Sequence, residues 1–249
     1  MDENRILVAI PVFNEIDVYD IIQKIKNLSL DIVVIDDGSS DEFRENLMHI
    51  EDIHMIIHSK NLGYGKTIID AFTFAINKGY DYVVTIDGDG QHEPEQIPLF
   101  LKEIPFYDYD ILSGSRYFIP AKTGKEVPKD RYLINKEITK ILNCITRFHI
   151  TDAFCGFKAY KVKKLKAMHV TEYGYGMPLQ LWIQAWKLGL RVKEIPVKLI
   201  YKDPKRNFKG ILEDPNTRLR YYKDIIKKEL ACLQQHNTAT RRGRQRVSF

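Results

Sequence analysis

The sequence predicts an α/β fold in which helices flank one mostly parallel sheet, and it predicts a single domain. Along the first half of the chain, short runs of β-branched residues alternate with stretches whose apolar residues recur at helical spacing. Parallel strands need crossover connections, so this alternation is typical of consecutive βαβ units. The 249 residues, 44% of them hydrophobic, suffice for one large core. The expected strands of this half cover residues 6–12, 31–35, 54–57, 82–86 and 110–112.

Each crossover should carry one apolar helix face, between residues 18 and 28 and again between residues 68 and 76. The second half is less regular. Gly, Pro and Lys are scattered over residues 117–130, which indicates a loop. Beyond it, the pattern predicts helices over about 131–147 and 178–188, a strand over 191–201 and a last helix from Pro215.

The expected domain covers residues 1–232 and is followed by a basic tail over residues 233–249. In the tail, Arg241, Arg242 and Arg244 follow a polar stretch with little apolar content, which is typical of disorder. The net charge of +5 is modest and lies partly in this tail. A basic tail can contact anionic lipid, but a solvated terminus is the simpler interpretation. We expect no nucleic-acid partner.

No stretch of the sequence approaches the roughly 18 consecutive apolar residues that cross a bilayer. The amino terminus also lacks the basic and then apolar build of a signal peptide. We therefore expect a cytoplasmic protein, with peripheral contact to the cytoplasmic membrane face as an open alternative. Cys144, Cys155 and Cys232 are odd in number and form no Cys-x-x-Cys pair, which indicates reduced, buried thiols.

Two carboxylates follow the fourth expected strand, in the segment Asp87-Gly88-Asp89-Gly90-Gln91. Residues two apart in extended chain lie on the same side, so Asp87 and Asp89 can share one cation. Mg²⁺ and Mn²⁺ prefer carboxylate oxygens and keep further positions for substrate phosphates, while Gly88 would let a ligand approach. Asp-Gly-Asp-Gly also suits a plain turn. The position after a parallel strand, where α/β sheets bind ligands, favours a nucleotide-diphosphate site.

The ends of the first two expected strands also carry polar residues. Asp36 and Asp37 follow the second strand and can accept hydrogen bonds from a nucleobase or ribose. Helix capping is the alternative for this turn, yet capping does not explain two consecutive aspartates. After the first strand, the ring of Phe13 suits the edge of a base, and Asn14 suits either a ligand contact or an N-cap.

The segment Gly63-Tyr64-Gly65-Lys66-Thr67 has the look of a phosphate-binding loop. A P-loop needs glycine five residues before Gly65, where this chain has Lys60. A dinucleotide fingerprint that starts at Gly63 would need glycine at Ile68. The segment is therefore predicted to be a Gly-rich turn at a helix start, whose backbone N–H groups and Lys66 can meet phosphate or ribose.

Four ordered motifs resemble those of the family-2 glycosyltransferases of the GT-A fold. The series continues with Arg116, Arg131, residues 152–157 and residues 195–197, and there it is most similar to the dolichol-phosphate mannose synthase branch. The resemblance covers residues from about 5 to 210. The four motifs are Ile10-Pro11-Val12-Phe13-Asn14-Glu15, Val34-Ile35-Asp36-Asp37-Gly38-Ser39, Asn61-Leu62-Gly63-Tyr64-Gly65-Lys66 and Asp87-Gly88-Asp89-Gly90-Gln91-His92.

The resemblance implies a nucleotide-sugar half over residues 1–115 and an acceptor half over residues 116–232. It assigns the metal, Mg²⁺ or Mn²⁺, to Asp87, Asp89 and Gln91. The residues that it implies in catalysis are Asp89, Asp152, Arg116 and Arg131, those near phosphates are Arg116, Arg131 and Arg206, and those around the donor are Pro11, Phe13, Asn14, Glu15, Asp37, Gly38, Gly63, Lys66, Asp87, Gly88, Asp89 and Gln91.

The resemblance further implies inverting, metal-dependent transfer of a mannose- or glucose-type sugar from a nucleoside-diphosphate sugar to a polyprenyl phosphate. GDP-mannose follows from the branch, although UDP-sugars use the same motifs. An ionised phosphate acceptor needs no strong base, whereas a saccharide or other hydroxyl acceptor would need one, and Asp152 falls where the resemblance places a carboxylate. A nucleotide-sugar-binding subunit without turnover is the non-enzyme alternative, against which the intact Asp87 and Asp89 pair argues.

The sequence departs from the branch in two respects. Phe154-Cys155 stands where the family pattern usually has Thr-Ser, which affects the expected acceptor site, and the carboxyl-terminal membrane helices of some relatives are missing. The bulky apolar residues between 173 and 186 are expected mainly in the core. Some of them could face a membrane surface or a membrane-anchored partner.

Overall fold

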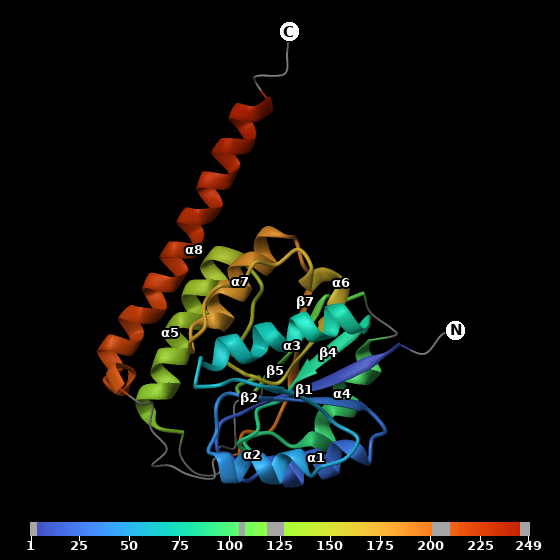
Figure 1. Ribbon diagram of the computed structural model, residues 1–249. Coiled ribbons are helices and arrows are strands. Elements are labelled where there is room, and N and C mark those ends of the chain that lie inside the picture. Colours follow the sequence, from blue (N-terminus) through green and yellow to red (C-terminus); the bar gives the residue numbers. More distant parts are fainter. Residues whose placement is uncertain (1–3, 105–107, 119–126, 201–209, 245–249) are drawn as a thin grey trace.

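The computed structural model describes residues 4–104, 108–118, 127–200 and 210–244, which form one sheet with helices on both faces (Figure 1). The order of the strands is β3-β2-β1-β4-β6-β5-β7. All neighbours are parallel except β6, which runs antiparallel to both β4 and β5. The predicted α/β class is confirmed. The strands are β1 (Ile6–Val12), β2 (Asp31–Asp36), β3 (His54–Ile57), β4 (Tyr82–Thr85), β5 (Ile111–Ser115), β6 (Lys158–Lys161) and β7 (Val192–Pro196).

Strands β1 to β4 match the predicted ranges to within one residue, and the later strands differ more. β5 extends further than predicted because Gly114 and Ser115 pair with β7. β7 ends at Pro196, so the predicted strand over residues 191–201 is too long, and residue 201 lies outside the described residues. β6 is not predicted at all, because four residues with two lysines carry no apolar alternation.

Helices cover both faces of the sheet, with α1, α2 and α4 on one face and α3, α5, α7 and α8 on the other (Figure 1). The short helices α2, α4 and α6 are not predicted from the sequence. The helices are α1 (Val18–Lys26), α2 (Asp41–Met48), α3 (Tyr64–Lys78), α4 (Ile97–Glu103), α5 (Lys129–Thr146), α6 (Val162–Leu165), α7 (Met177–Lys187) and α8 (Pro215–Arg244), with 3₁₀ turns η1 (Pro94–Gln96) and η2 (Gly210–Glu213).

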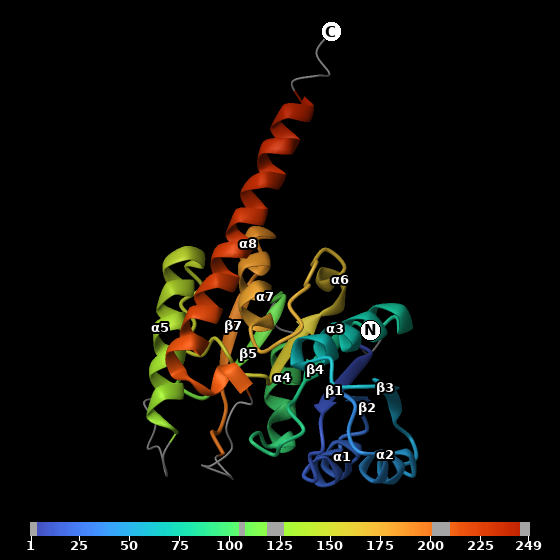
Figure 2. The same ribbon diagram turned by 60° about the vertical axis from the view of Figure 1, so that its left-hand side comes forward.

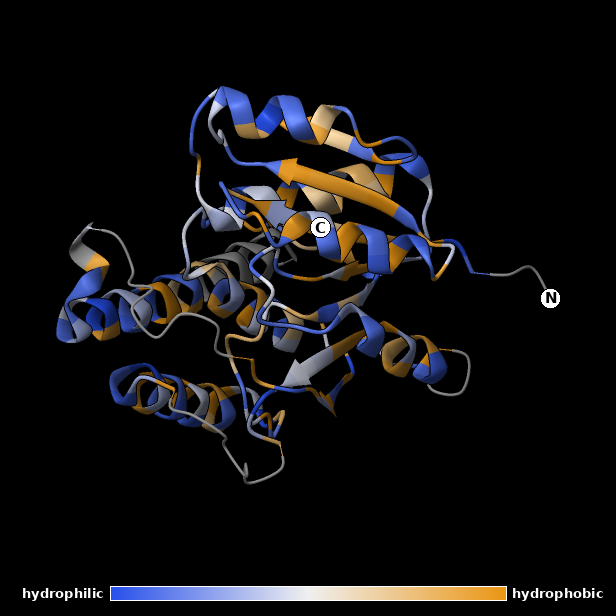
Figure 3. Cartoon of the chain, turned by 90° about the horizontal axis from the view of Figure 1, so that it is seen from below, coloured by the Kyte–Doolittle hydropathy of each residue, from blue (hydrophilic) through white to orange (hydrophobic). Residues whose placement is uncertain are grey.

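The sheet separates two hydrophobic clusters. Along β1, Leu7 and Ala9 face the cluster beneath α3, while Val8 and Ile10 face the cluster above α1, so both faces of this strand are buried. The helices in Figure 3 carry hydrophobic and hydrophilic residues side by side, as helices with one buried face do. Most bulky residues of α7 lie in the core, among them Trp182, which is fully buried, whereas Trp186 is exposed.

The cysteines and the last helix differ from expectation. Cys155 is buried as expected, but Cys144 and Cys232 are exposed. Helix α8 continues to Arg244, so residues 233–244 of the expected disordered tail are helical and project from the body (Figure 2). Residues 245–249 lie outside the described residues. Within the described part of the chain, no helix is both long and apolar enough to span a bilayer.

The Gly-rich turn before α3 packs tightly against the segment that leads into α7. A Cβ at Gly65 would lie 2.2 Å from the carbonyl oxygen of Glu172, and one at Gly63 would lie 2.4 Å from that of Tyr173. On its other side, this segment meets α8, where the Tyr221 hydroxyl donates to Glu172 Oε1 at 2.6 Å. The two halves of the chain are therefore joined through backbone that tolerates no added side chain.

Replacing Gly65 with Ala tests this joint. Helix propensity alone favours Ala by up to about 1 kcal/mol, whereas the clash with the Glu172 carbonyl should destabilise the protein by about 1–3 kcal/mol. Chemical unfolding of Gly65→Ala should therefore show a loss. Asn77→Ala, at an exposed position of the same helix, is the control and should change little or gain slightly. A stabilised Gly65→Ala protein would contradict the packing described.

Candidate active site

The candidate site lies at the carboxyl edge of the central strands. Strands β1, β2 and β4 are parallel, so the residues that follow them meet at one edge of the sheet. Two contacts show that the segments after these strands lie together: Asp37 N–H donates to the Val12 carbonyl at 2.8 Å, and Gly88 packs against the Pro11 carbonyl. Because β6 is antiparallel to β4, the segment before β6 arrives at the same edge.

Asp87 and Asp89 lie in a turn after β4 rather than in the extended chain that the spacing predicts. The backbone N–H of Gln91 donates to Asp89 Oδ1 at 3.0 Å, as in an Asx-turn. A Cβ at Gly88 would lie 2.9 Å from the Pro11 carbonyl oxygen, so this glycine serves close backbone packing. This segment can therefore be both a turn and a ligand site, because both carboxylates remain at the carboxyl edge of the sheet.

The Asp87 side chain is 27% exposed, but its Oδ1 atom is buried. Its Oδ1 atom has no hydrogen-bond partner, and a Cβ at Gly156 would lie only 2.4 Å from that atom. Burial, followed by the charge on Asp89, raises the pKa of Asp87 to about 6. A cation would bind the unpartnered oxygen and would offset both the burial of Asp87 and its repulsion by Asp89. The residues present therefore fit a divalent metal ion.

The protein offers that ion few further ligands of its own. Within the described ranges, no three His, Cys, Asp or Glu side chains gather into a metal-binding group. Asp87 and Asp89 would therefore share the ion with Gln91, water or substrate phosphate oxygens. Sites for Mg²⁺ commonly have this composition, with one or two carboxylates and substrate phosphates.

His92 forms the inner wall beside Asp87. Its Nε2 atom lies 3.8 Å from Asp87 Oδ2 and 3.9 Å from Cys155 Sγ. Burial lowers the pKa of His92 to about 3 and raises the pKa of the Cys155 thiol to about 12, so both side chains are uncharged. Neither group therefore neutralises the Asp87 carboxylate.

Arg116, which follows β5, forms a buried bidentate ion pair with Asp152. Its Nε and Nη2 atoms donate to the two carboxylate oxygens at 2.7 and 3.0 Å. Burial opposes ionisation, but the charge and hydrogen bonds of Arg116, together with the Asn135 amide, hold the pKa of Asp152 well below its usual range. A weakly basic, fully buried carboxylate is poorly suited to act as a general base.

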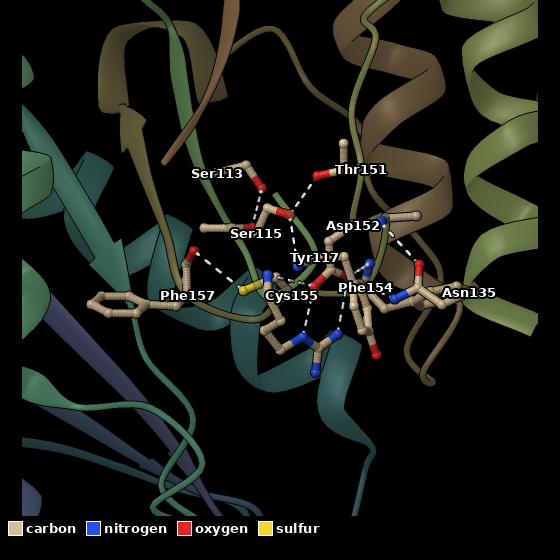
Figure 4. Close-up of polar contacts among 12 residues, drawn as sticks. Ser113, Ser115, Tyr117, Asn135, Thr151, Asp152, Phe154, Cys155 and Phe157 are labelled. Atoms are coloured by element: carbon tan, nitrogen blue, oxygen red, sulfur yellow. Dashed lines mark hydrogen bonds and ion pairs between the residues drawn. The ribbon is translucent and has the colours of Figure 1, made fainter. Parts of the chain in front are cut away.

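The segment around Asp152 is fixed from three elements, as Figure 4 shows in part. From α5, Asn135 Nδ2 donates to Asp152 Oδ1 at 2.7 Å. From β7, the Glu194 carboxylate accepts the backbone N–H groups of Thr151 at 2.8 Å and Asp152 at 3.1 Å. From β5, the Ser115 hydroxyl lies 2.5 Å from that of Thr151. The position of Arg116 is therefore determined by a rigid frame.

The other two candidate arginines are less well defined by the structure. Arg131 lies in the first turn of α5, is half-buried, and acts electrostatically on the Tyr222 phenol of α8. Its proximity to donor or acceptor phosphate stays a prediction. Arg206 lies outside the described residues.

Asp37 points toward the Gly-rich turn. Its oxygens accept the backbone N–H groups of Leu62 at 2.8 Å and Gly63 at 2.9 Å, and Oδ1 lies 2.7 Å from His58 Nδ1. The residue is 4% exposed. Asp37 thus holds the Gly-rich turn, and this role is not predicted from the sequence.

The two remaining donor candidates of this region also make contacts within the protein. Gly38 has a φ of +77°, and a Cβ there would lie 2.4 Å from the Lys60 carbonyl carbon, so glycine is required by space as well as by backbone conformation. Lys66 forms an ion pair with Asp70 one helical turn away. Its contact with a phosphate stays a prediction.

The end of β1 is tied to the turn after β2. Asn14 N–H donates to the Ser39 hydroxyl at 2.9 Å, and Asn14 Oδ1 accepts the Ser40 N–H at 2.9 Å. Asn14 is not the N-cap of α1, because Asp17 occupies that position. Pro11 is buried within β1, while Phe13 and Glu15 are half-buried beyond the strand.

Two functional candidates, Lys158 and His58, are not predicted from the sequence. Lys158 of β6 is 2% exposed, donates from Nζ to the Cys155 carbonyl and lies 5.5 Å from the Trp182 ring centroid. His58 follows β3 and bridges two aspartates. A single lysine in a short strand and a single histidine after one carry no sequence signal, because their partners lie far away in the chain.

Comparison with known proteins identifies the family of this chain. Residues 7–168 match the family model described as glycosyl transferase family 2. The chain belongs to this family, and it is a glycosyltransferase. The strand-end carboxylates after β4 lie inside the matched region.

Curated relatives cover most of the chain. An undecaprenyl-phosphate mannosyltransferase of Micrococcus luteus is 27% identical over 80% of this chain and 85% of its own length. A UDP-N-acetylglucosamine–dolichyl-phosphate N-acetylglucosaminyltransferase of Methanococcus voltae is 26% identical over 82% of this chain and 88% of its own length. Both relatives are named for sugar transfer to a polyprenyl-type phosphate.

The fold has a solved counterpart. Glucosyl-3-phosphoglycerate synthase of Mycobacterium tuberculosis has a TM-score of 0.71 and 16% identity, over 91% of this chain and 80% of that chain. The same enzyme has been solved with Mg²⁺ and UDP, with a TM-score of 0.64, 16% identity and coverage of 91% and 79%. At this identity the likeness shows the GT-A fold alone.

The buried charge of Asp87 predicts a pH-dependent stability. Its pKa of about 6 exceeds the unfolded value of about 3.9, so protonation stabilises the fold below about pH 4 and this stabilisation is lost as the pH rises through 6. At pH 7, metal-free Asp87→Asn should therefore be more stable than wild type by about 1–2 kcal/mol, allowing for partial exposure of the carboxylate.

Thermal unfolding from pH 4 to pH 8 measures this effect, and the gain should vanish at the acid end. Mn²⁺ should raise the melting temperature of wild type but not of Asp87→Asn. Glu45→Gln, at an exposed position of α2, is the control and should show neither effect. Equal stability of Asp87→Asn and wild type at every pH would contradict the unsatisfied carboxylate.

Proposed function

We propose that this protein is an inverting, metal-dependent glycosyltransferase that moves a sugar from a nucleoside-diphosphate sugar to a polyprenyl phosphate. The observation that carries the proposal is the buried, unpartnered Oδ1 atom of Asp87, beside Asp89 at the carboxyl edge of the sheet. The relatives named for transfer to undecaprenyl and dolichyl phosphate support the acceptor class.

Asp87 and Asp89, with Gln91, would hold Mg²⁺ or Mn²⁺ together with the donor diphosphate. When bound, the ion supplies positive charge that stabilises the negative charge on the leaving diphosphate. Gly156 and the neutral His92 close the inner side of the carboxylate and limit the access of water. These residues therefore favour a charged ligand on the outer side.

The transfer forms one bond and breaks one bond. An acceptor phosphate oxygen bonds to the anomeric carbon from the face opposite the leaving group, as the bond to the diphosphate oxygen breaks and the diphosphate leaves with the electron pair. No proton needs to be removed, because the acceptor phosphate is already ionised near neutral pH. The anomeric configuration inverts.

Arg116 and Asp152 fit a phosphate acceptor better than a hydroxyl acceptor. The Asp152 carboxylate already accepts hydrogen bonds from Arg116 and Asn135, so it offers little basicity for removing a hydroxyl proton. Arg116, held by this carboxylate, is positioned to place positive charge near donor or acceptor phosphate. Arg131 is proposed for the same task from α5.

The donor nucleotide is left open between two classes. The mannosyltransferase relative favours a mannose donor such as GDP-mannose, whereas the relative from Methanococcus voltae is named for UDP-N-acetylglucosamine. The acceptor class implies contact with a membrane surface or a membrane-anchored partner on the cytoplasmic side. Exposed apolar side chains of the acceptor half that could provide such contact are Phe118, Tyr132, Leu133, Tyr173 and Tyr175.

A transfer assay tests the proposal directly. Purified protein with Mn²⁺ should transfer label from GDP-mannose or a UDP-sugar to polyprenyl phosphate in detergent, and Asp89→Asn should nearly abolish transfer without loss of fold. Glu45→Gln should transfer at the wild-type rate. Transfer to saccharides but not to lipid phosphate, or a retained anomeric configuration in the product, would contradict the proposal.

The acceptor class can also be tested by comparing two variants. With a phosphate acceptor, Arg131→Ala should lower the rate severely, whereas Asp152→Asn should lower it moderately once the folded fraction is taken into account. With a hydroxyl acceptor the order should reverse. Loss of about a hundredfold or more in Asp152→Asn, beside a mild defect in Arg131→Ala, would identify Asp152 as a base.

A further inference from the structure

His58 lies between two carboxylates at the end of β3. Its Nδ1 atom is 2.7 Å from Asp37 Oδ1, and its Nε2 atom is 2.8 Å from Asp70 Oδ2. Its backbone N–H donates to the Asp36 carbonyl at 2.9 Å, which fixes the ring at the sheet edge. The side chain is 6% exposed. Such a bridge joins β3, the end of β2 and helix α3.

The bridge requires a particular protonation state. Ionised carboxylates only accept hydrogen bonds, so both ring nitrogens must donate, and only the imidazolium form does so. The charged groups around the ring are Asp37 beyond β2 and, on α3, Asp70 with its ion-pair partner Lys66. Two carboxylates, one imidazolium and one ammonium make this cluster electrically neutral.

The cluster holds the Gly-rich turn. Asp37 accepts the N–H groups of Leu62 and Gly63, and Asp70 and Lys66 lie in the first turns of the helix that follows. The turn therefore takes its position from His58 through Asp37 at one end and through Asp70 at the other. If the ring donated only once, one carboxylate would face a nitrogen lone pair and be repelled.

We propose that His58, as a doubly donating bridge between Asp37 and Asp70, is a positioning residue for the Gly-rich turn and, through it, for nucleoside-diphosphate binding. The second part rests on the proposed function, in which this turn borders the donor. His58 touches no reacting atom and acts only by setting the backbone of residues 61–64.

The first experiment uses the protein alone. Nuclear magnetic resonance of the His58 ring nitrogens in the full-length, metal-free protein should show both nitrogens protonated while the bridge is intact. Asp70→Asn changes this requirement, because an amide N–H can donate to Nε2 while a neutral ring donates from Nδ1 to Asp37. A neutral His58 ring in wild type under conditions where Asp37 and Asp70 are both ionised would overturn the bridge.

The second experiment measures binding of GDP and UDP by calorimetry in the presence of Mn²⁺. His58→Gln, which donates from one end only, should weaken binding about tenfold, the usual size for a hydrogen bond to a charged group. His54→Gln, at the exposed start of the same strand, is the control and should bind as wild type.

The outcomes separate this inference from the proposed function. If wild type binds neither nucleotide, the proposed function fails and the donor role of the turn fails with it, while the ring measurement still decides whether the bridge exists. If wild type binds a nucleotide and folded His58→Gln binds it equally well, the positioning role is overturned and the proposed function stands.

Discussion

The contact between the Asp87 carboxylate and Gly156 is the constraint on which the site depends. The antiparallel strand β6 brings Gly156 to the carboxyl end of β4, where no side chain larger than hydrogen fits beside the carboxylate. The contact excludes water from Oδ1 but supplies no hydrogen bond in return. The fold therefore keeps a carboxylate in an unfavourable state, as binding sites often do, and a cation is the simplest group that relieves it.

The opposite arrangement prevails at Asp152, in the segment between α5 and β6. Asp152 is more deeply buried than Asp87, yet its charge is matched by Arg116 and its oxygens accept several donors. Two aspartates near the same edge of the sheet thus differ in role because of their partners. The satisfied one builds a rigid frame, and the unsatisfied one remains ready for a ligand.

The sequence predicts the parts of this protein that depend on neighbours in the chain. Strands β1 to β3 follow from apolar runs, and the Asp87 and Asp89 pair stands out because both residues follow a predicted strand. Strand β6 and the His58 bridge depend on partners far away in the sequence, so the local sequence pattern does not predict them. The resemblance to a family implies which residues surround the donor but does not distinguish those expected to bind a ligand from those, such as Asp37, that hold the turn.

The glycines of the Gly-rich turn illustrate this difference. Spacing excludes a P-loop, and the structure supplies another reason for the same residues: Gly63 and Gly65 allow close approach of the segment that enters α7. Asp37 and His58 hold one side of the turn, while Glu172 and Tyr221 brace the other. A change in the segment before α7 can thus reach the Gly-rich turn through backbone contact alone. The motif acts first as a joint between the halves, and any contact with phosphate builds on that joint.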